Sequence, residues 1–277
     1  DFVFKNIFGS EKHPNILISF LNATLKPKDL ITAVEIKNTD LNKGYIEDKF
    51  SRLDVKATTS NNEIINIEIQ LKNEYNMIKR SLFYWSKLYS DQLNEGEDYS
   101  VLKRTICINI LNFKYLKTRK FHSGYRLKEI YSNEELTDVA EIHFIEIPKL
   151  EEGTDEKDML VAWIEFLKNP ESEKVRSLEM SIDEIREAKD ELIRMSNDDT
   201  QRELYEMRAK TLKDKISALN EAERKGIKKG RQEGIKEGEK SKAIEIAKSL
   251  INIGLDKETI SKSTGLDLNE IEKLMSK

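Results

Sequence analysis

The segment from Leu53 to Leu71 constrains the fold most, because it contains two runs in which the side chains alternate with a period of two. Such alternation is typical of β-strands, whose successive side chains point to opposite faces. Residues 59–63 separate the runs and are rich in the Ser and Asn of polar turns. In the second run, one face carries Ile65, Ile67, Ile69 and Leu71, and the other carries Ile64, Asn66, Glu68 and Gln70. The sequence therefore predicts a β-hairpin.

The register of this hairpin brings two acidic residues together. If Thr58 pairs with Ile64, the turn comprises residues 59–63 and Asp54 lies directly opposite Glu68. Directly opposed Cβ atoms are about 4.5–5.5 Å apart, and like charges there are destabilising. A hard divalent cation would relieve the repulsion, since such ions bind carboxylate oxygens. The alternative is that both carboxylates belong to the solvated face of a half-buried sheet.

The flanking segments predict an α/β fold. A short aromatic helix ends at Gly9, a second helix runs to Leu25, and strands follow at residues 31–36, 45–57 and 63–71. A helix over residues 74–93 precedes apolar strands at 101–113 and 141–148, and this order favours a parallel right-handed crossover. We therefore expect a mixed sheet flanked by helices. The apolar spacing predicts a buried face on the helix over 74–93 made of Ile78, Leu82, Trp85 and Tyr89.

The character of the chain changes after Pro148, where charged helices are predicted over residues 158–167, 182–195 and 202–222. A glycine then recurs at every fourth position, and residues 223–242 carry eight Lys or Arg against four Glu. Each glycine costs about 1 kcal/mol inside a helix, so this tract is either a flexible linker or a surface for close helix–helix approach. We divide the chain into a core (1–150), a charged helical region (151–222), the glycine-repeat basic linker or helix (223–242) and a small helical module (243–277).

Composition limits the classes of function. The net charge of −4 gives the chain no overall attraction to nucleic acid, so any such site must be local. The single cysteine, Cys107, excludes an internal disulfide and fits a reducing compartment, and we expect a cytoplasmic protein. No apolar run is as long as a membrane span, so no membrane partner is expected. The three histidines, His13, His122 and His143, are dispersed and form no metal-binding motif.

The order of elements, with Asp54 on the second strand and Glu68-Ile69-Gln70 on the third, resembles the PD-(D/E)XK nuclease core. Lysine is usual at the last position of that pattern. The glutamine at this position, Gln70, makes the pattern similar to that of the Rpn family of recombination-promoting nucleases and related transposases. Three more stretches carry the same resemblance, namely Asp1 to Gly9, Tyr84 to Tyr99, and the glycine-repeat tail ending in Ile260 to Leu266.

This resemblance implies roles for individual residues. Asp54 and Glu68 would bind Mg²⁺ (or Mn²⁺), the backbone carbonyl of Ile69 would be a third ligand, and Gln70 would orient the attacking water or the scissile phosphate. A neutral amide cannot supply the positive charge of lysine to the transition state. Lys56 projects on the same face and could supply it, although a solvated surface lysine is the alternative. Asp1 could reach the site from the first helix, or it could simply cap that helix.

The function implied is metal-dependent hydrolysis of DNA phosphodiester bonds by an endonuclease linked to recombination or mobile elements. The alternative is a catalytically weak or inactive nuclease fold that binds DNA or protein and assembles through its C-terminal helices. Metal-dependent cleavage of DNA, abolished by a chelator, distinguishes the two.

The last helices, residues 243–277, have the lengths of a helix-turn-helix, but the final one is acidic. Residues 267–277 carry Asp267, Glu270 and Glu272 against Lys273 and Lys277, whereas a helix that enters a DNA groove should be cationic. We therefore favour an oligomerisation or partner-docking module and expect a homo-oligomer. Weak phosphate contacts are expected from the basic tract, at Lys225, Lys228, Lys229 and Arg231.

Overall fold

The computed structural model describes residues 2–37, 54–73, 75–151, 153–154 and 158–275. The chain divides into two compact units, Asp1–Arg208 and Ala209–Lys277. The first unit contains the sheet and the second contains only helix and short connections among its described residues.

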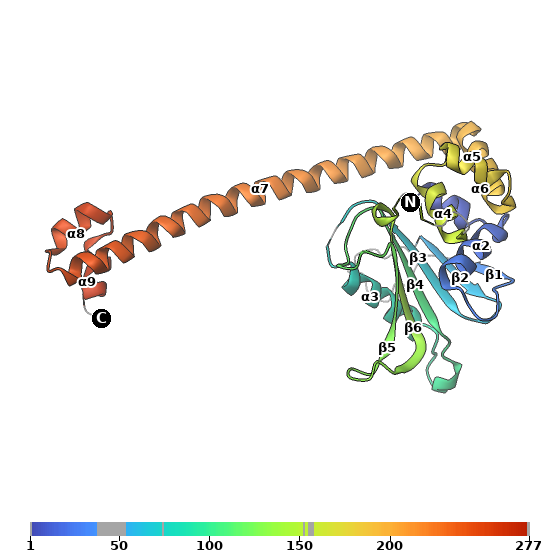
Figure 1. Ribbon diagram of the computed structural model, residues 1–277, viewed down its shortest axis with the longest axis horizontal. Coiled ribbons are helices and arrows are strands. Elements are labelled where there is room, and N and C mark those ends of the chain that lie inside the picture. Colours follow the sequence, from blue (N-terminus) through green and yellow to red (C-terminus); the bar gives the residue numbers. More distant parts are fainter. Residues whose placement is uncertain (1, 38–53, 74, 152, 155–157, 276–277) are drawn as a thin grey trace. The chain divides into compact units, whose positions relative to one another are not determined.

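A mixed sheet forms the centre of the first unit (Figure 1), with the strand order β1-β2-β3-β4-β6-β5 among the described residues. The pairs β3–β4 and β4–β6 are parallel, and the other neighbours are antiparallel. The strands are β1 (Val34–Lys37), β2 (Val55–Thr59), β3 (Ile64–Gln70), β4 (Thr105–Leu111), β5 (His122–Lys128) and β6 (Glu135–Glu146). The predicted α/β fold and the parallel crossover are confirmed.

The register of the predicted hairpin is also confirmed. Thr58 pairs with Ile64, and Val55 pairs with Ile67. Residues 45–53 of the strand predicted over 45–57 lie outside the described residues. Because Asp54 precedes Val55 and Glu68 follows Ile67, the two acidic residues come to opposite positions where β2 begins.

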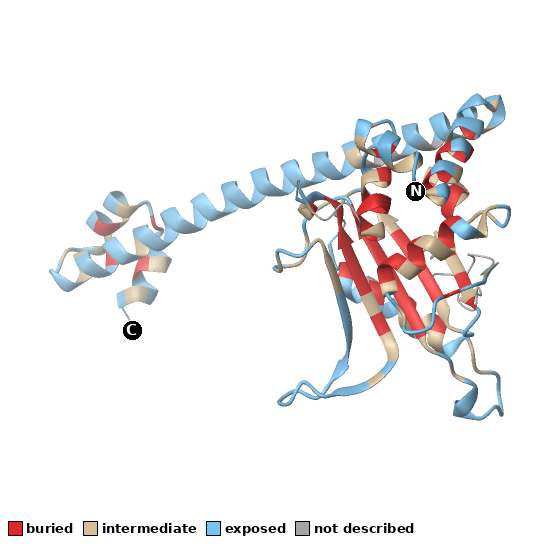
Figure 2. Cartoon of the chain, turned by 45° about the vertical axis from the view of Figure 1, so that its right-hand side comes forward, coloured by how far each residue is buried: buried red, intermediate tan, exposed pale blue. Residues whose placement is uncertain are grey.

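Helices cover one face of the sheet and share one hydrophobic core with it. Isoleucines of β3 and β4, such as Ile67 and Ile108, are fully buried there, and Phe8 packs edge-on against Trp163. Burial in Figure 2 is concentrated on the sheet and these helices. The helices that follow residue 150 thus belong to the same core as those that precede the sheet. The helices of this face are α1 (Phe2–Phe8), α2 (Pro14–Leu25), α4 (Met159–Lys168), α5 (Glu173–Glu179) and α6 (Asp183–Asn197).

The helix α3 (Met77–Ser90) packs on the other face, against β4 and β6. Its predicted buried face is wrong at Ile78 and Leu82, which are 46% and 49% exposed, whereas Trp85 and Tyr89 are partly buried. The buried residues are Met77, Ser81, Tyr84 and Leu88. Ser81 accepts a hydrogen bond from the amide Nδ2 of buried Asn109 at 2.9 Å, so a polar contact belongs to the buried face. A pattern based on apolar residues alone rotates the helix away from its true orientation.

The sequence did not predict strand β5, which forms a hairpin with β6. Its residues are intermediate or exposed and mostly polar, so no apolar alternation marks it. Strand β6 also extends further toward the N-terminus than predicted, and this extension pairs with β5. Two short 3₁₀ turns, η1 (Tyr99–Val101) and η2 (Ile147–Lys149), flank β4 and β6.

One continuous helix, α7 (Asp199–Asn252), includes the glycine tract. The tract is therefore helical, so of the two alternatives that the sequence left open, a flexible linker or a helix, it is the helix. A Cβ added at any of the four glycines of the repeat would meet nothing within 4 Å. The end of α7 packs with α8 (Lys257–Thr264) and α9 (Leu268–Met275) around Ala247, Ile260, Leu266 and Ile271. None of the helices in the described residues combines the length and apolar character that a membrane crossing requires.

Candidate active site

The two predicted acidic residues lie together at the point where β2 and β3 meet. A backbone hydrogen bond fixes Asp54, whose Oδ2 accepts from the amide of Ile69 at 2.8 Å. Glu68 lies in β3 on the face that α3 covers, and its side chain is only 4% exposed. The hairpin register therefore holds both carboxylates in place.

The charges of this pair are poorly compensated. Burial, and then the negative charge of Asp54, raises the pKa of Glu68 to about 8. Burial also raises the pKa of Asp54, against the hydrogen bond from Ile69 and the positive charges of Lys5 and Arg80. The Oε1 atom of Glu68 is buried and has no hydrogen-bond partner among the described residues. Buried polar atoms are normally satisfied, so this oxygen lacks a partner that a cation would supply.

The backbone of Ile69 presents a further oxygen to the same place. In a strand, the N–H and C=O of one residue point to the same side, as the exchange of bonds in antiparallel pairs requires. Since the amide of Ile69 points to Asp54, its carbonyl faces that side as well. Alternation along β3 agrees, because the next residue, Gln70, uses its carbonyl on the β4 side to accept from Asn112 at 2.9 Å.

This set of donors fits a small hard cation. Carboxylate and carbonyl oxygens suit Mg²⁺, which usually keeps several waters and takes only one or two carboxylates from the protein. Nowhere among the described residues do three or more His, Cys, Asp or Glu side chains gather as a complete metal cluster. Any cation at Asp54 and Glu68 would therefore keep positions for water and substrate, as a catalytic site requires and a closed structural site does not.

Arg80 of α3 reaches the same group of residues, although the sequence did not single it out. Its Nη2 lies 3.4 Å from Glu68 Oε2. When the amide oxygen of Gln70 faces the guanidinium, the orientation that satisfies both groups, it accepts from Nη2 at 3.1 Å and from Nη1 at 3.3 Å. The guanidinium carbon also lies 5.4 Å from the ring centre of Tyr84. The misplaced buried face of α3 hid this residue, since the correct face turns Arg80 toward the sheet.

The other predicted residues are less closely tied to the site. Lys56 pairs in register with Asn66, and no ion pair joins it to either carboxylate within the described residues. Asp1 lies outside the described residues. The four cations of the basic tract are exposed on α7, where Lys225 pairs with Glu221 at 2.6 Å and Lys229 lies 3.8 Å from Glu233.

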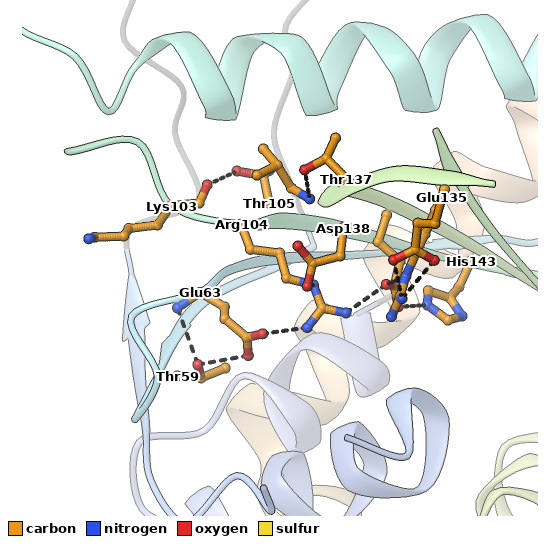
Figure 3. A network of polar contacts seen from close by, with 12 residues as sticks. Thr59, Glu63, Lys103, Arg104, Thr105, Glu135, Thr137, Asp138 and His143 are labelled. Carbon is orange, nitrogen blue, oxygen red and sulfur yellow. Dashed lines mark hydrogen bonds and ion pairs between the residues drawn. The ribbon is translucent and has the colours of Figure 1, made fainter. Parts of the chain in front are cut away.

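Two of the three histidines are not dispersed, contrary to the sequence analysis. His122 Nε2 and His143 Nδ1 lie 2.8 Å apart, and His143 Nε2 lies 2.6 Å from Glu141 Oε1. Arg104 donates to Glu141 Oε2 at 2.6 Å and to Glu63 at 2.7 Å. Figure 3 shows Arg104 between Glu63 and the rest of this polar network, which includes His143. Antiparallel pairing of the unpredicted strand β5 with β6 brings the two histidines together.

The buried thiol of Cys107 is unsuited to nucleophilic attack, because burial raises its pKa to about 12.

The sequence model of the family described as PD-(D/E)XK nuclease family transposase matches residues 1–222 of the chain. The chain belongs to this family. The resemblance inferred from the Asp54 and Glu68-Ile69-Gln70 pattern is thus confirmed, and the family match extends through α4, α5 and α6.

A second match covers residues 240–276 and is described as the C-terminal HTH domain of the Rpn/YhgA-like nuclease family. It confirms the resemblance to the Rpn family. It also favours the helix-turn-helix interpretation of this module, which the acidic last helix had placed second. Neither a curated protein nor a solved structure is found to match the chain.

Proposed function

We propose that this chain is a metal-dependent DNA endonuclease, with Asp54 and Glu68 as ligands of Mg²⁺ or Mn²⁺ and the Ile69 carbonyl as a third ligand. One observation carries the proposal. The buried Oε1 of Glu68 has no hydrogen-bond partner among the described residues and lies in register with Asp54. Burying a charge without a partner is costly, and a cation between the two carboxylates would remove that cost.

The net reaction adds water across a phosphodiester. The water oxygen forms a bond to phosphorus as the bond to the leaving oxygen breaks, and the products are a phosphate monoester and an alcohol. When bound, the metal lowers the pKa of water and stabilises negative charge on the phosphoryl group. Asp54 and Glu68 hold positions for that ion, and the hydrogen bond from Ile69 fixes the direction of the Asp54 carboxylate. Gln70 adjoins them on β3 and would orient the attacking water or the scissile phosphate.

The family description supports a link to mobile elements and DNA recombination, and the helix-turn-helix match supports DNA as the substrate. Lys225, Lys228, Lys229 and Arg231 are exposed on α7 and would add weak phosphate contacts. A cytoplasmic location rests on the single, buried, unpaired cysteine.

Assembly through the C-terminal helices is a separate part of the proposal, supported by the glycine repeat on α7. A pair of helices packed through this stripe would be pushed apart by added methyl groups. The double substitution Gly230→Ala and Gly234→Ala meets no atom within 4 Å in the single chain and should stabilise a lone helix. Light scattering that shows a smaller particle for this variant supports assembly through the stripe, and an unchanged particle contradicts it.

The experiment that tests the function is cleavage of supercoiled plasmid with Mg²⁺, with Mn²⁺ and with EDTA. The variant Asp54→Asn keeps an oxygen to accept from Ile69 but loses the charge, and we expect its rate to fall at least about 100-fold. Glu35→Gln is the matched control, because this strand carboxylate is 69% exposed and pairs with Lys37 outside the site. Its rate should equal that of the wild type.

The outcomes separate the two functions. Cleavage that EDTA abolishes and that Asp54→Asn lacks supports the endonuclease. Undiminished cleavage by Asp54→Asn would contradict the assignment of Asp54 to the active site. DNA binding with no cleavage in either metal identifies the chain as a nuclease fold that only binds, in which the neutral Gln70 has replaced a catalytic lysine.

A further inference from the structure

The position that lysine occupies in the PD-(D/E)XK pattern is held here by a neutral amide, yet a cation lies against it. Arg80 approaches from α3, and its guanidinium adjoins both the Gln70 amide and Glu68 Oε2. The charge that is missing from β3 is therefore present on the helix that covers this face of the sheet.

The contacts of Glu68 divide between its two oxygens. Oε2 lies 3.4 Å from Arg80 Nη2, whereas Oε1 is the buried atom without a hydrogen-bond partner in the described part of the chain. One oxygen thus faces a fixed cation and the other is open to a metal ion. A cation at Oε1 and the guanidinium at Oε2 would sit side by side on one carboxylate.

The guanidinium of Arg80 is restricted in orientation but remains partly exposed to solvent. The oxygen of Gln70 and the ring of Tyr84 restrict its orientation, while the Arg80 side chain remains 31% exposed. A guanidinium presents five N–H donors in a planar fork that matches phosphate geometry.

We propose that Arg80 supplies the positive charge that lysine provides in the usual pattern, contacting the scissile phosphate, and that Gln70 acts as the positioning residue that holds the guanidinium. This inference rests on the proposed nuclease function. It gives Gln70 a different task from orienting water, because its oxygen is occupied by Arg80 and its neutral amide aligns the charge. A lysine at position 70 would place a second cation against the first.

The test is a double-mutant cycle on the full chain, with single-turnover cleavage of a short DNA duplex in Mg²⁺. Arg80→Gln should lower the rate about 100-fold, since one fixed charge at a developing oxyanion contributes that much. Gln70→Lys should leave the rate unchanged or lower it. Combining the two substitutions should recover most of the loss, because the lysine then fills the vacated place. Arg80→Lys is a second variant that keeps the charge and should retain more activity than Arg80→Gln.

A readout independent of cleavage is Ca²⁺ binding by calorimetry. Arg80 repels a neighbouring cation, so Arg80→Gln should raise the affinity for Ca²⁺ by about two- to tenfold. If Arg80 only holds Glu68 in place, its removal lowers Ca²⁺ affinity together with the rate, and lysine at position 70 gives no rescue. Either result overturns the inference.

The wild type, assayed in parallel, separates this inference from the proposed function. If the wild type cleaves DNA and Arg80→Gln cleaves it at the same rate, the proposed role of Arg80 is overturned but the nuclease function is not. Absence of metal-dependent cleavage by the wild type overturns the nuclease and the role of Arg80 with it.

Discussion

Two buried glutamates of the same sheet, Glu141 and Glu68, differ in how completely their carboxylate oxygens are paired. Glu141, near the start of the segment of β6 that pairs with β4, accepts from Arg104, Arg126 and His143, and both of its oxygens are used. Glu68, toward the end of β3, has Arg80 Nη2 at 3.4 Å from Oε2, and hydrogen bonds with the Asp54 backbone and the Asn66 side chain also lower its pKa, but Oε1 has no partner among the described residues. The exposed fraction is 3% for both residues, so the two carboxylates differ chiefly in how many partners compensate their charge.

The pKa values follow this difference. Burial alone would raise the pKa of Glu141, but the hydrogen bonds from His143, Arg104 and Arg126 lower it to about 2. For Glu68, burial, reinforced by the negative charge of Asp54, raises the pKa to about 8. A buried carboxylate whose oxygens all have partners stabilises one arrangement of the strands. A buried carboxylate with an unpaired oxygen lowers the stability of the fold unless a ligand binds to it. The comparison indicates a structural network at Glu141 and supports the proposed metal site at Glu68.

The largest effect on stability should come from Glu141→Gln. This change leaves Arg104 and Arg126 facing a neutral amide, and breaking a buried ion pair costs about 3–5 kcal/mol. We expect chemical denaturation to show a loss of about 3 kcal/mol in the free energy of unfolding. Glu135→Gln, at the exposed contact with Arg126, is the control and should cost no more than about 1 kcal/mol. A loss no greater than that of the control would contradict a structural role for the network.

Acid should weaken the same network before it affects the fold elsewhere. Burial, and then the charges of His143 and Lys26, lowers the pKa of His122 from 6.5 to about 4. The unfolded chain then takes up a proton near pH 6.5 that the folded chain refuses until about pH 4, so stability falls as pH falls through this window. The expected loss is on the order of 2–3 kcal/mol. Glu141 adds a further loss between pH 4.5 and about 2.

Urea unfolding at pH 7 and at pH 5 measures this dependence. His122→Gln removes the titrating ring and can still bond to His143, so its free energy of unfolding should change less between the two pH values than that of the wild type. Equal changes in the two proteins would show that His122 does not carry the acid sensitivity.

The sequence predicted the site of Glu68 much better than the network of Glu141. Alternation along residues 53–71 fixed the register, and the register alone brings Asp54 to Glu68. Arg80 was missed because Ser81, a polar residue, lies on the buried face of α3 and Ile78 lies outside it, so apolar spacing misjudged the rotation of the helix. The network was missed because it depends on β5, whose polar and exposed residues carry no strand signal, and on residues far apart in sequence such as Glu63 and Arg126.

A smaller loss of stability is expected from a side chain at Gly124, because it would crowd the ring of His143 in this network. Gly124 pairs with His143 across β5 and β6, and a Cβ at position 124 would lie 3.0 Å from His143 Cε1. The ring of His143 cannot easily move, because contacts at both of its nitrogens and the stacked ring of His122 hold it. Gly124→Ala should therefore cost about 1–2 kcal/mol. The neighbouring Ser123→Ala, paired with Phe144 on β6, is the control, and equal thermal stability of the two variants would show that His143 yields freely.

The smallest expected effect has the opposite sign and sharpens the comparison most. Glu68→Gln replaces a buried carboxyl, whose charged form has no full partner in the described structure, with a neutral amide, and the amide oxygen can still face Arg80. In EDTA we expect the free energy of unfolding to hold or to rise by about 1 kcal/mol, whereas the same chemical change at Glu141 lowers it. Adding Mg²⁺ should stabilise the wild type and leave Glu68→Gln unchanged, because a ligand stabilises only the state that binds it. Denaturation of both proteins with and without Mg²⁺ measures these differences. A loss as large as that of Glu141→Gln would mean that Glu68 is another structural partner of an arginine, and the contrast between the two ends of the sheet would not hold.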